Sequence, residues 1–128
     1  IFDTEIGSLV TLNSTDLTVL TTGVYDLTFA AQLTSTGQRS SVECAIFIGT
    51  NQLSPSDFSY IRNVNGLDKD SVRVQYKGTI AANEVISVQF RRHGTVTANC
   101  ILANLPTTGA GSINAGRANC QLDILKVG

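Results

Sequence analysis

The stretch "TGVYDLTFAAQLTST", residues 22–36, alternates apolar with polar side chains along most of its length. Its apolar positions are every second residue, namely Tyr25, Leu27, Phe29, Ala31 and Leu33. The polar residues that fall between them are Asp26, Thr28, Gln32 and Thr34. Because successive side chains of a β-strand point to opposite faces, this pattern predicts a strand with one buried and one solvated face. Gly23 marks the turn through which the chain enters it.

Period-two patterns continue through the rest of the chain, in segments rich in Val, Ile, Thr, Tyr and Phe. The alternating segments are residues 71–80, 84–93, 96–102 and 117–126. The segment 42–49, "VECAIFIG", is apolar on both faces, which predicts a central strand or one that a partner covers.

Turn-type residues separate the predicted strands. They cluster at residues 35–41, 50–59, 63–71 and 106–116, and "AANE" at 81–84 indicates a tight hairpin connection. No segment keeps a helical period for three turns. The sequence therefore predicts an all-β fold of roughly eight strands, in an antiparallel two-sheet sandwich or jelly roll.

The bulk composition is that of one globular domain, which we expect to span residues 1–128. Hydrophobic residues make up 42% and charged residues 15%. The net charge of -1 is spread along the chain, so a nucleic-acid partner is not expected. No apolar run approaches the roughly 20 residues that span a bilayer, so membrane insertion is not expected either. The opening "IFDTEIGSLV" shows neither an initiator Met nor a leader, and we expect the C-terminal part of a longer protein.

The three cysteines, Cys44, Cys100 and Cys120, each lie in an apolar segment. We interpret them as small buried hydrophobic residues with free thiols, and one disulfide plus one free thiol is the alternative. Zinc is not expected, because no Cys-x-x-Cys pair exists and His93 is the sole histidine.

The search for catalytic chemistry gives few candidates. His93 lies on a polar strand face without a recognisable nucleophile motif, so we interpret it as a surface or interface histidine. "GAGSIN" at 109–114 lacks the spacing and the Lys of a phosphate loop. Asp57, Asp68 and Asp70 are interpreted as solvated loop carboxylates, with calcium as the alternative. We expect no enzyme, no catalytic residue, no metal and no cofactor.

Arg91 and Arg92 precede His93, and alternation places their side chains on opposite faces. Arg92 then falls on the apolar side, where it must reach solvent or an acidic partner. A salt bridge to a loop or to a neighbouring subunit is one interpretation. Recognition of an acidic sugar or another carboxylate is the other.

The order of these segments resembles the C1q/TNF-like jelly roll over about residues 16–127. Gly23, Tyr25, Leu27 and Phe29 match a Gly-x-Tyr-x-Phe-like strand of that family, and "IFIG" at 46–49 matches the strand that follows. "IAANEVISV" at 80–88 matches a hairpin usually written Leu-x-x-Gly-Asp-x-Val-x-Val. In this chain Asn83 and Glu84 replace the Gly-Asp pair, and the last strand lacks the aromatic residues usual in animal members.

The resemblance implies a homotrimer around a threefold axis, and a strand that is apolar on both faces would independently need a second cover. The candidates for the trimer interface are Ile46, Phe47, Ile48, Tyr76, Phe90 and Arg92. The candidates for receptor-binding loops are Arg39, Arg62 and Lys69.

A composition rich in Thr, Ser, Asn and Gly, with few charges and no Met or Trp, is similar to that of a viral capsid appendage. Bacteriophages use TNF-like knobs as the heads of spikes, fibres and tail needles. We therefore expect a virion-surface head that binds a protein or glycan receptor on the host cell and contacts other virion proteins through its N-terminal side. The alternatives are a secreted, extracellular C1q-like binding module, for which the sequon at Asn13 is relevant, and a purely structural trimerisation cap.

Overall fold

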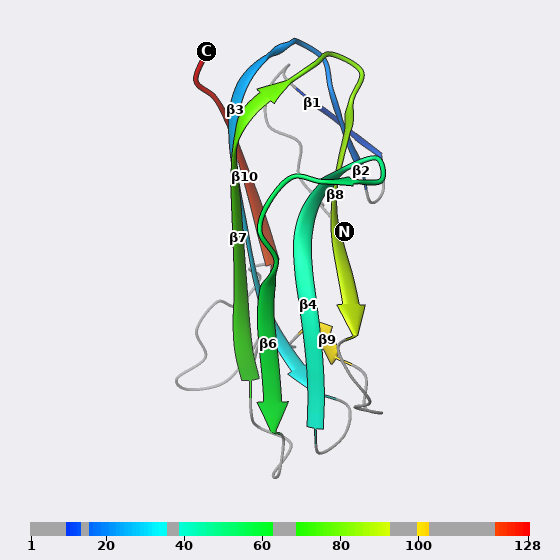
Figure 1. Cartoon of the computed structure of the whole chain (residues 1–128), viewed down its shortest axis with the longest axis vertical. Coiled ribbons are helices and arrows are strands. Elements are labelled where there is room, and N and C mark those ends of the chain that lie inside the picture. The colour runs from blue at the N-terminus through cyan, green and yellow to red at the C-terminus, as the bar shows by residue number, and fades with distance from the viewer. Residues whose placement is uncertain (1–9, 14–15, 36–38, 63–68, 93–99, 103–119) are drawn as a thin grey trace, which may run out of the picture.

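The computed structural model describes residues 10–13, 16–35, 39–62, 69–92, 100–102 and 120–128 (Figure 1). In this part of the chain all regular structure is β-strand, which confirms the predicted all-β class. The strands are β1 (Val10–Asn13), β2 (Asp16–Val19), β3 (Gly23–Ser35), β4 (Arg39–Ile48), β5 (Asn51–Gln52), β6 (Asp57–Arg62), β7 (Lys69–Ile80), β8 (Val85–Arg92), β9 (Cys100–Leu102) and β10 (Cys120–Lys126).

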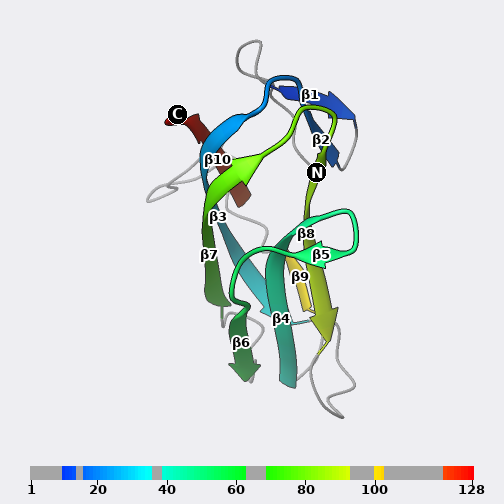
Figure 2. The ribbon, with the colours of Figure 1, turned by 45° about the horizontal axis from the view of Figure 1, so that its top comes forward.

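The strands form two sheets, and every pairing in them is antiparallel. The first sheet has the order β1-β2-β8-β4-β5, and β6 also pairs with β4. The second has the order β10-β3-β7, and β9 also pairs with β3. The short strand β5 forms a small hairpin with the end of β4 (Figure 2). Two antiparallel sheets are compatible with the predicted sandwich.

The alternating stretch at residues 22–36 contains β3, the central strand of the second sheet. It pairs with β7 from Gly23 to Thr34 along one edge, and with β10 and then β9 along the other. Its five alternating apolar residues, from Tyr25 to Leu33, are each at most 4% exposed. Period two therefore predicted both the strand and its buried face correctly.

The core lies between the inner faces of the two sheets. Buried residues of β2, β3, β4, β6, β7 and β8 form one hydrophobic cluster, in which Val19, Tyr25, Leu27, Ile46, Ile80 and Ile86 are fully enclosed. Strand β4 has β8 on one edge and β5 and β6 on the other, so it is the central strand that its apolar sequence predicted.

The connection at residues 81–84 does not close a hairpin, contrary to the prediction. Among the described residues, β7 pairs with β3, whereas β8 pairs with β2 and β4, so the connection carries the chain from one sheet to the other. The turn is tight because Asn83 adopts a left-handed φ of 70° and Glu84 Oε2 accepts a hydrogen bond from the Ala81 N–H. Turn residues show where a chain reverses but not which strand it will pair with.

Two carboxylates join the neighbouring edges of the sheets. Asp57 on β6 accepts a hydrogen bond from the Arg73 N–H of β7 at 2.7 Å. Ser59, which is fully buried on β6, donates to Asp70 Oδ2 on β7 at 2.7 Å. Asp57 and Asp70, predicted as solvated loop carboxylates, therefore lie in strands and bind protein groups. Asp68 lies outside the described residues.

Candidate functional site

The outer face of β4 and β8 carries a row of paired side chains. Since Cys44 and Ile46 point into the core, the alternate residues Glu43, Ala45 and Phe47 point outward. Across the ladder, Glu43 lies opposite Arg91, Ala45 opposite Gln89 and Phe47 opposite Ser87. This register places an acid opposite a base, an amide opposite a small apolar residue and an aromatic ring opposite a hydroxyl.

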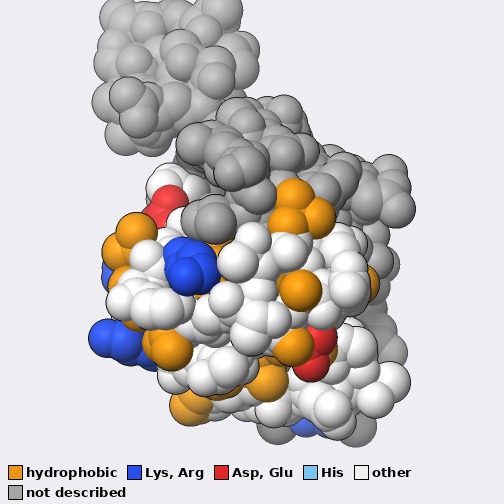
Figure 3. Space-filling view, turned by 90° about the horizontal axis from the view of Figure 1, so that it is seen from above, with side chains coloured by type: hydrophobic (Ala, Val, Ile, Leu, Met, Phe, Trp, Pro, Cys, Tyr) orange, Lys and Arg blue, Asp and Glu red, His pale blue; other side chains and the backbone are white. Residues whose placement is uncertain are grey.

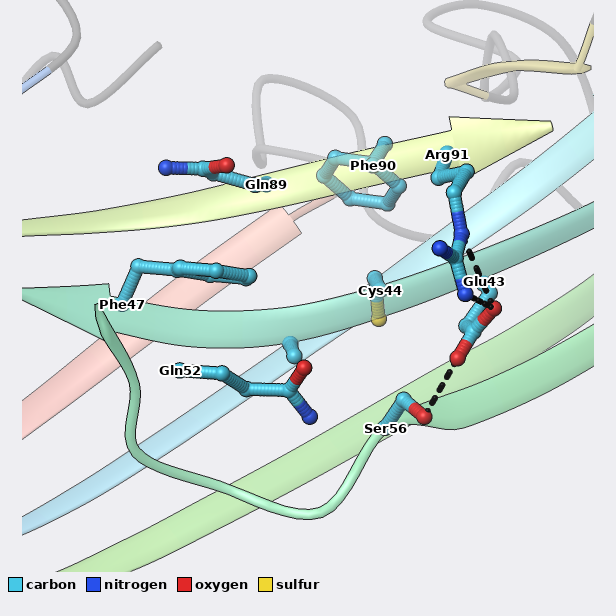
Figure 4. A pocket seen from close by; sticks show the side chains of 9 residues that line it. Glu43, Cys44, Phe47, Gln52, Ser56, Gln89, Phe90 and Arg91 are labelled. Atoms are coloured by element: carbon cyan, nitrogen blue, oxygen red, sulfur yellow. Dashed lines mark hydrogen bonds and ion pairs between the residues drawn. The ribbon is translucent and has the colours of Figure 1, made fainter. Parts of the chain in front are cut away.

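A pocket of about 240 Å³ opens over this row (Figure 4). The residues that line it are Glu43, Cys44, Ala45, Phe47, Gln52, Ser56, Gln89, Phe90 and Arg91. Ala45 is only 4% exposed although it belongs to the outer face, because larger side chains surround it. The pocket thus combines a small apolar residue, an aromatic ring and a set of polar groups.

The segment that follows β5 completes the pocket because it is fastened to β4. The N–H groups of Leu53 and Ser54 donate to the Ile46 carbonyl at 2.8 and 3.4 Å. In return, the Ile46 N–H donates to Ser54 Oγ at 2.9 Å, and Ser54 is 3% exposed. These bonds position Gln52 and Ser56, on either side of the segment, against the outer face of β4.

The charged groups of the pocket are paired with each other. Arg91 donates from Nη2 and Nε to Glu43 Oε2 at 2.6 and 3.2 Å. Ser56 Oγ donates to the other carboxylate oxygen, Oε1, at 2.6 Å. The Glu43 side chain is 20% exposed and that of Arg91 is 74% exposed. The carboxylate is therefore fixed through both oxygens, and its charge offsets that of the guanidinium.

Two carboxamides lie on the other sides of the pocket. Gln52 donates from Nε2 to the Ser54 carbonyl at 2.8 Å, and its own carbonyl oxygen faces β4 (Figure 4). Gln89 donates from Nε2 to the Gly49 carbonyl and to Ser87 Oγ, each at 3.4 Å, which is the long end of the hydrogen-bond range. Gln52 thus makes one short hydrogen bond, whereas the two hydrogen bonds of Gln89 are long and therefore weak.

The structure gives the predicted interface residues different positions. Ile46 is fully buried in the core and presents no surface to a neighbouring subunit. Ile48 and Tyr76 are partly buried against the same core. Phe47 lines the outer pocket.

The last two predicted interface residues lie at the end of β8. Phe90 is 44% exposed and its ring meets that of buried Phe29 edge to face, with centroids 5.8 Å apart. The backbone of Arg92 pairs with Val42, and its side chain lies outside the described part of the structure, as does His93. Nothing in the described residues tests the threefold contact.

The predicted receptor residues lie in strands rather than in loops. Arg39 begins β4 and Arg62 ends β6, and these two exposed residues are direct partners across the ladder. Lys69 begins β7, opposite Thr34, and its side chain is outside the described set. The fold thus brings Arg39 and Arg62 together at one end of the first sheet, although they are distant in sequence.

Cys44 and Cys120 are free thiols. Burial, followed by the negative charge of Asp57, raises the pKa of the Cys44 thiol to about 11. Cys44 is thus a protonated core residue at neutral pH, and the pocket above it holds no thiolate nucleophile. The side chain of Cys100 lies outside the described residues.

Sequence reasoning singled out neither Glu43, Gln52 nor Ser56. Glu43 is a charged residue inside the otherwise apolar stretch 42–48, and this was the one available signal. Ser56 lies 13 residues from Glu43, and Arg91 lies 48 residues from it. The sheet register brings Arg91 to Glu43, and the segment attached to Ile46 brings Ser56 there.

No family model matches the chain, and no curated protein matches its sequence. Within the described ranges, no helix is long and apolar enough to cross a membrane. The same ranges contain no group of three or more His, Cys, Asp and Glu side chains placed to hold a metal ion.

Proposed function

We propose that the chain is the C1q/TNF-like jelly-roll head of a bacteriophage spike, fibre or tail needle, and that it binds the host-cell surface as a homotrimer. The observation that carries a binding role is the pocket on the outer face of β4 and β8. Its Glu43, Ser56 and Arg91 side chains are fixed by hydrogen bonds to each other, and it lies on an exposed sheet face where a large ligand can reach it.

The order of the strands supports the jelly roll. Several neighbours within a sheet are distant in sequence, with β8 between β2 and β4, and β3 between β7 and β10. Several connections, including those from β3 to β4 and from β7 to β8, pass between the two sheets. Greek-key sandwiches and jelly rolls are built from such crossovers.

The exposed apolar side chains support a contact between subunits. The large ones are Leu20, Phe58, Tyr60, Phe90, Leu125 and Val127, each between 44% and 61% exposed. Seen from above, apolar side chains form separate patches among polar ones (Figure 3). A trimer contact that covers several patches would remove apolar surface from water, at about 25 cal/mol per Å².

The attachment role is tested by competition. The purified chain is added, with the virus that encodes it, to cells of that virus's host, and free virus is counted over time. We expect the chain to slow adsorption in a dose-dependent way. If adsorption is unchanged at saturating chain while virions that lack the domain fail to assemble, the chain is a trimerisation cap.

A further inference from the structure

We propose that the pocket over β4 and β8 binds a neutral sugar ring of a host glycan. This inference rests on the proposed attachment function and names the ligand class of the same site. Its polar lining residues come from three separate segments of the chain, at residues 43, 52–56 and 89–91, and surround the small side chain of Ala45.

The size of the pocket limits the ligand. At about 240 Å³ it is smaller than sites for drug-sized molecules, which occupy about 300–1,000 Å³. A single six-membered sugar ring suits this volume, with the remainder of the glycan extending into solvent. The pocket lies on an open sheet face, so the connection to the next sugar meets no wall of described residues.

The lining is complementary to a ring that has one apolar face and several hydroxyls. Phe47 and Ala45 provide apolar contact for the C–H groups of a sugar ring. Gln52 offers its carbonyl oxygen as an acceptor, and the weakly hydrogen-bonded amide of Gln89 can supply both a donor and an acceptor. Adjacent hydroxyls need such mixed partners, because each hydroxyl both donates and accepts.

The charge of the pocket favours a neutral ring over an acidic one. Arg91 alone would attract a carboxylate, but its guanidinium already binds Glu43 at 2.6 Å. An acidic sugar would have to displace Glu43 or lie beside its negative charge. A guanidinium has five N–H donors, and the ion pair uses two of its nitrogens, so donors remain for a hydroxyl.

The test is a titration of the ¹⁵N-labelled chain with four neutral probes and one acidic probe. The neutral probes are the methyl glycosides of glucose, galactose, mannose and N-acetylglucosamine, and the acidic probe is the methyl glycoside of sialic acid. We expect at least one neutral probe to give saturable shifts confined to residues 43–47, 52–56 and 87–91. The acidic probe should bind those residues more weakly.

Matched variants locate the site. Phe47→Ala and Gln89→Ala should each weaken the affinity for the bound neutral probe about tenfold or more. Gln75→Ala removes an exposed amide from β7, outside the pocket, and should change affinity by less than about twofold. If Phe47→Ala does not fold, Phe47→Leu and Gln89→Glu test the same contacts with side chains of similar size.

Three results would overturn the inference: no neutral probe shifts the pocket residues, the acidic probe binds there more tightly, or the control variant loses as much affinity as the pocket variants. The attachment function fails separately. A chain that blocks virus adsorption without binding a neutral probe keeps that function and loses this ligand class. A chain that binds the probe in the pocket but does not block adsorption loses the attachment function.

Discussion

At the scale of single residues, two core side chains show how the fold accommodates buried polar atoms. Tyr25 is fully buried, and its hydroxyl donates to the Thr21 carbonyl four residues earlier in the chain. This bond fixes the entry into β3, the strand on which the second sheet is built. The buried Cys44 instead keeps its proton.

Replacing Tyr25 with Phe should destabilise the chain by about 1 kcal/mol, because it leaves the Thr21 carbonyl without this donor. The free energy of unfolding, measured by urea titration, tests the value. Tyr60→Phe is the matched control, since Tyr60 is 48% exposed on β6, and it should change stability by less than about 0.5 kcal/mol. An equal loss in both variants would contradict the role of the Tyr25 hydroxyl.

The raised pKa of Cys44 predicts a loss of stability in alkali. An unfolded thiol loses its proton near its usual pKa of 9.0, whereas the folded thiol keeps it up to about 11. The folded state therefore binds more protons between these values, and stability falls as pH rises through them, by about 2–3 kcal/mol at most. Urea titrations of the wild type and of Cys44→Ala at pH 8 and pH 11 should show a smaller loss in the variant.

At the scale of strands, the two sheets depend on the link between β6 and β7. Asp57 accepts hydrogen bonds from the backbone N–H groups of Phe58 and Arg73, at 2.9 and 2.7 Å. The second of these bonds reaches from one sheet to the other. It also satisfies a donor at the edge strand β7, where, among the described strands, no further partner pairs.

Asp57→Ala should lower the free energy of unfolding by about 1–3 kcal/mol, because the Arg73 N–H loses the carboxylate to which it donates. Asp123→Ala is the control, since Asp123 is exposed on β10 and accepts from Gln121 two residues away, within a single strand. Thermal unfolding followed by circular dichroism compares the two. If Asp123→Ala is destabilised as much as Asp57→Ala, the hydrogen bond between the two sheets makes no specific contribution to the free energy of unfolding.

Strands were more predictable from the sequence than their pairing. Period two in residues 25–33 reports directly which side chains are buried, since a strand with one solvated face must alternate. Which strand the chain pairs with after a turn depends on the whole sheet and not on the turn residues. Residues 81–84 were therefore predicted as a hairpin, although they connect the two sheets. The pocket was missed for the same reason: Glu43 and Arg91 meet through register, and Ser56 reaches them through the segment that is hydrogen-bonded to Ile46.

At the scale of the whole molecule, the outer faces of the two sheets differ. The face over β4 and β8 holds the pocket, whereas the exposed positions of β7 on the other sheet are the polar residues Ser71, Arg73, Gln75, Lys77 and Thr79. The proposal of an attachment head requires several copies of the pocket to act together. Three weak sites on one rigid head gain avidity without any new contact.

Assembly into a homotrimer is the claim on which the attachment head most depends. Sedimentation equilibrium of the purified chain, over a wide range of concentrations, tests it most directly. The account predicts a single species of about three times the 13.6 kDa chain mass that persists on dilution. A species of 13.6 kDa that stays monomeric at the highest concentration would contradict it.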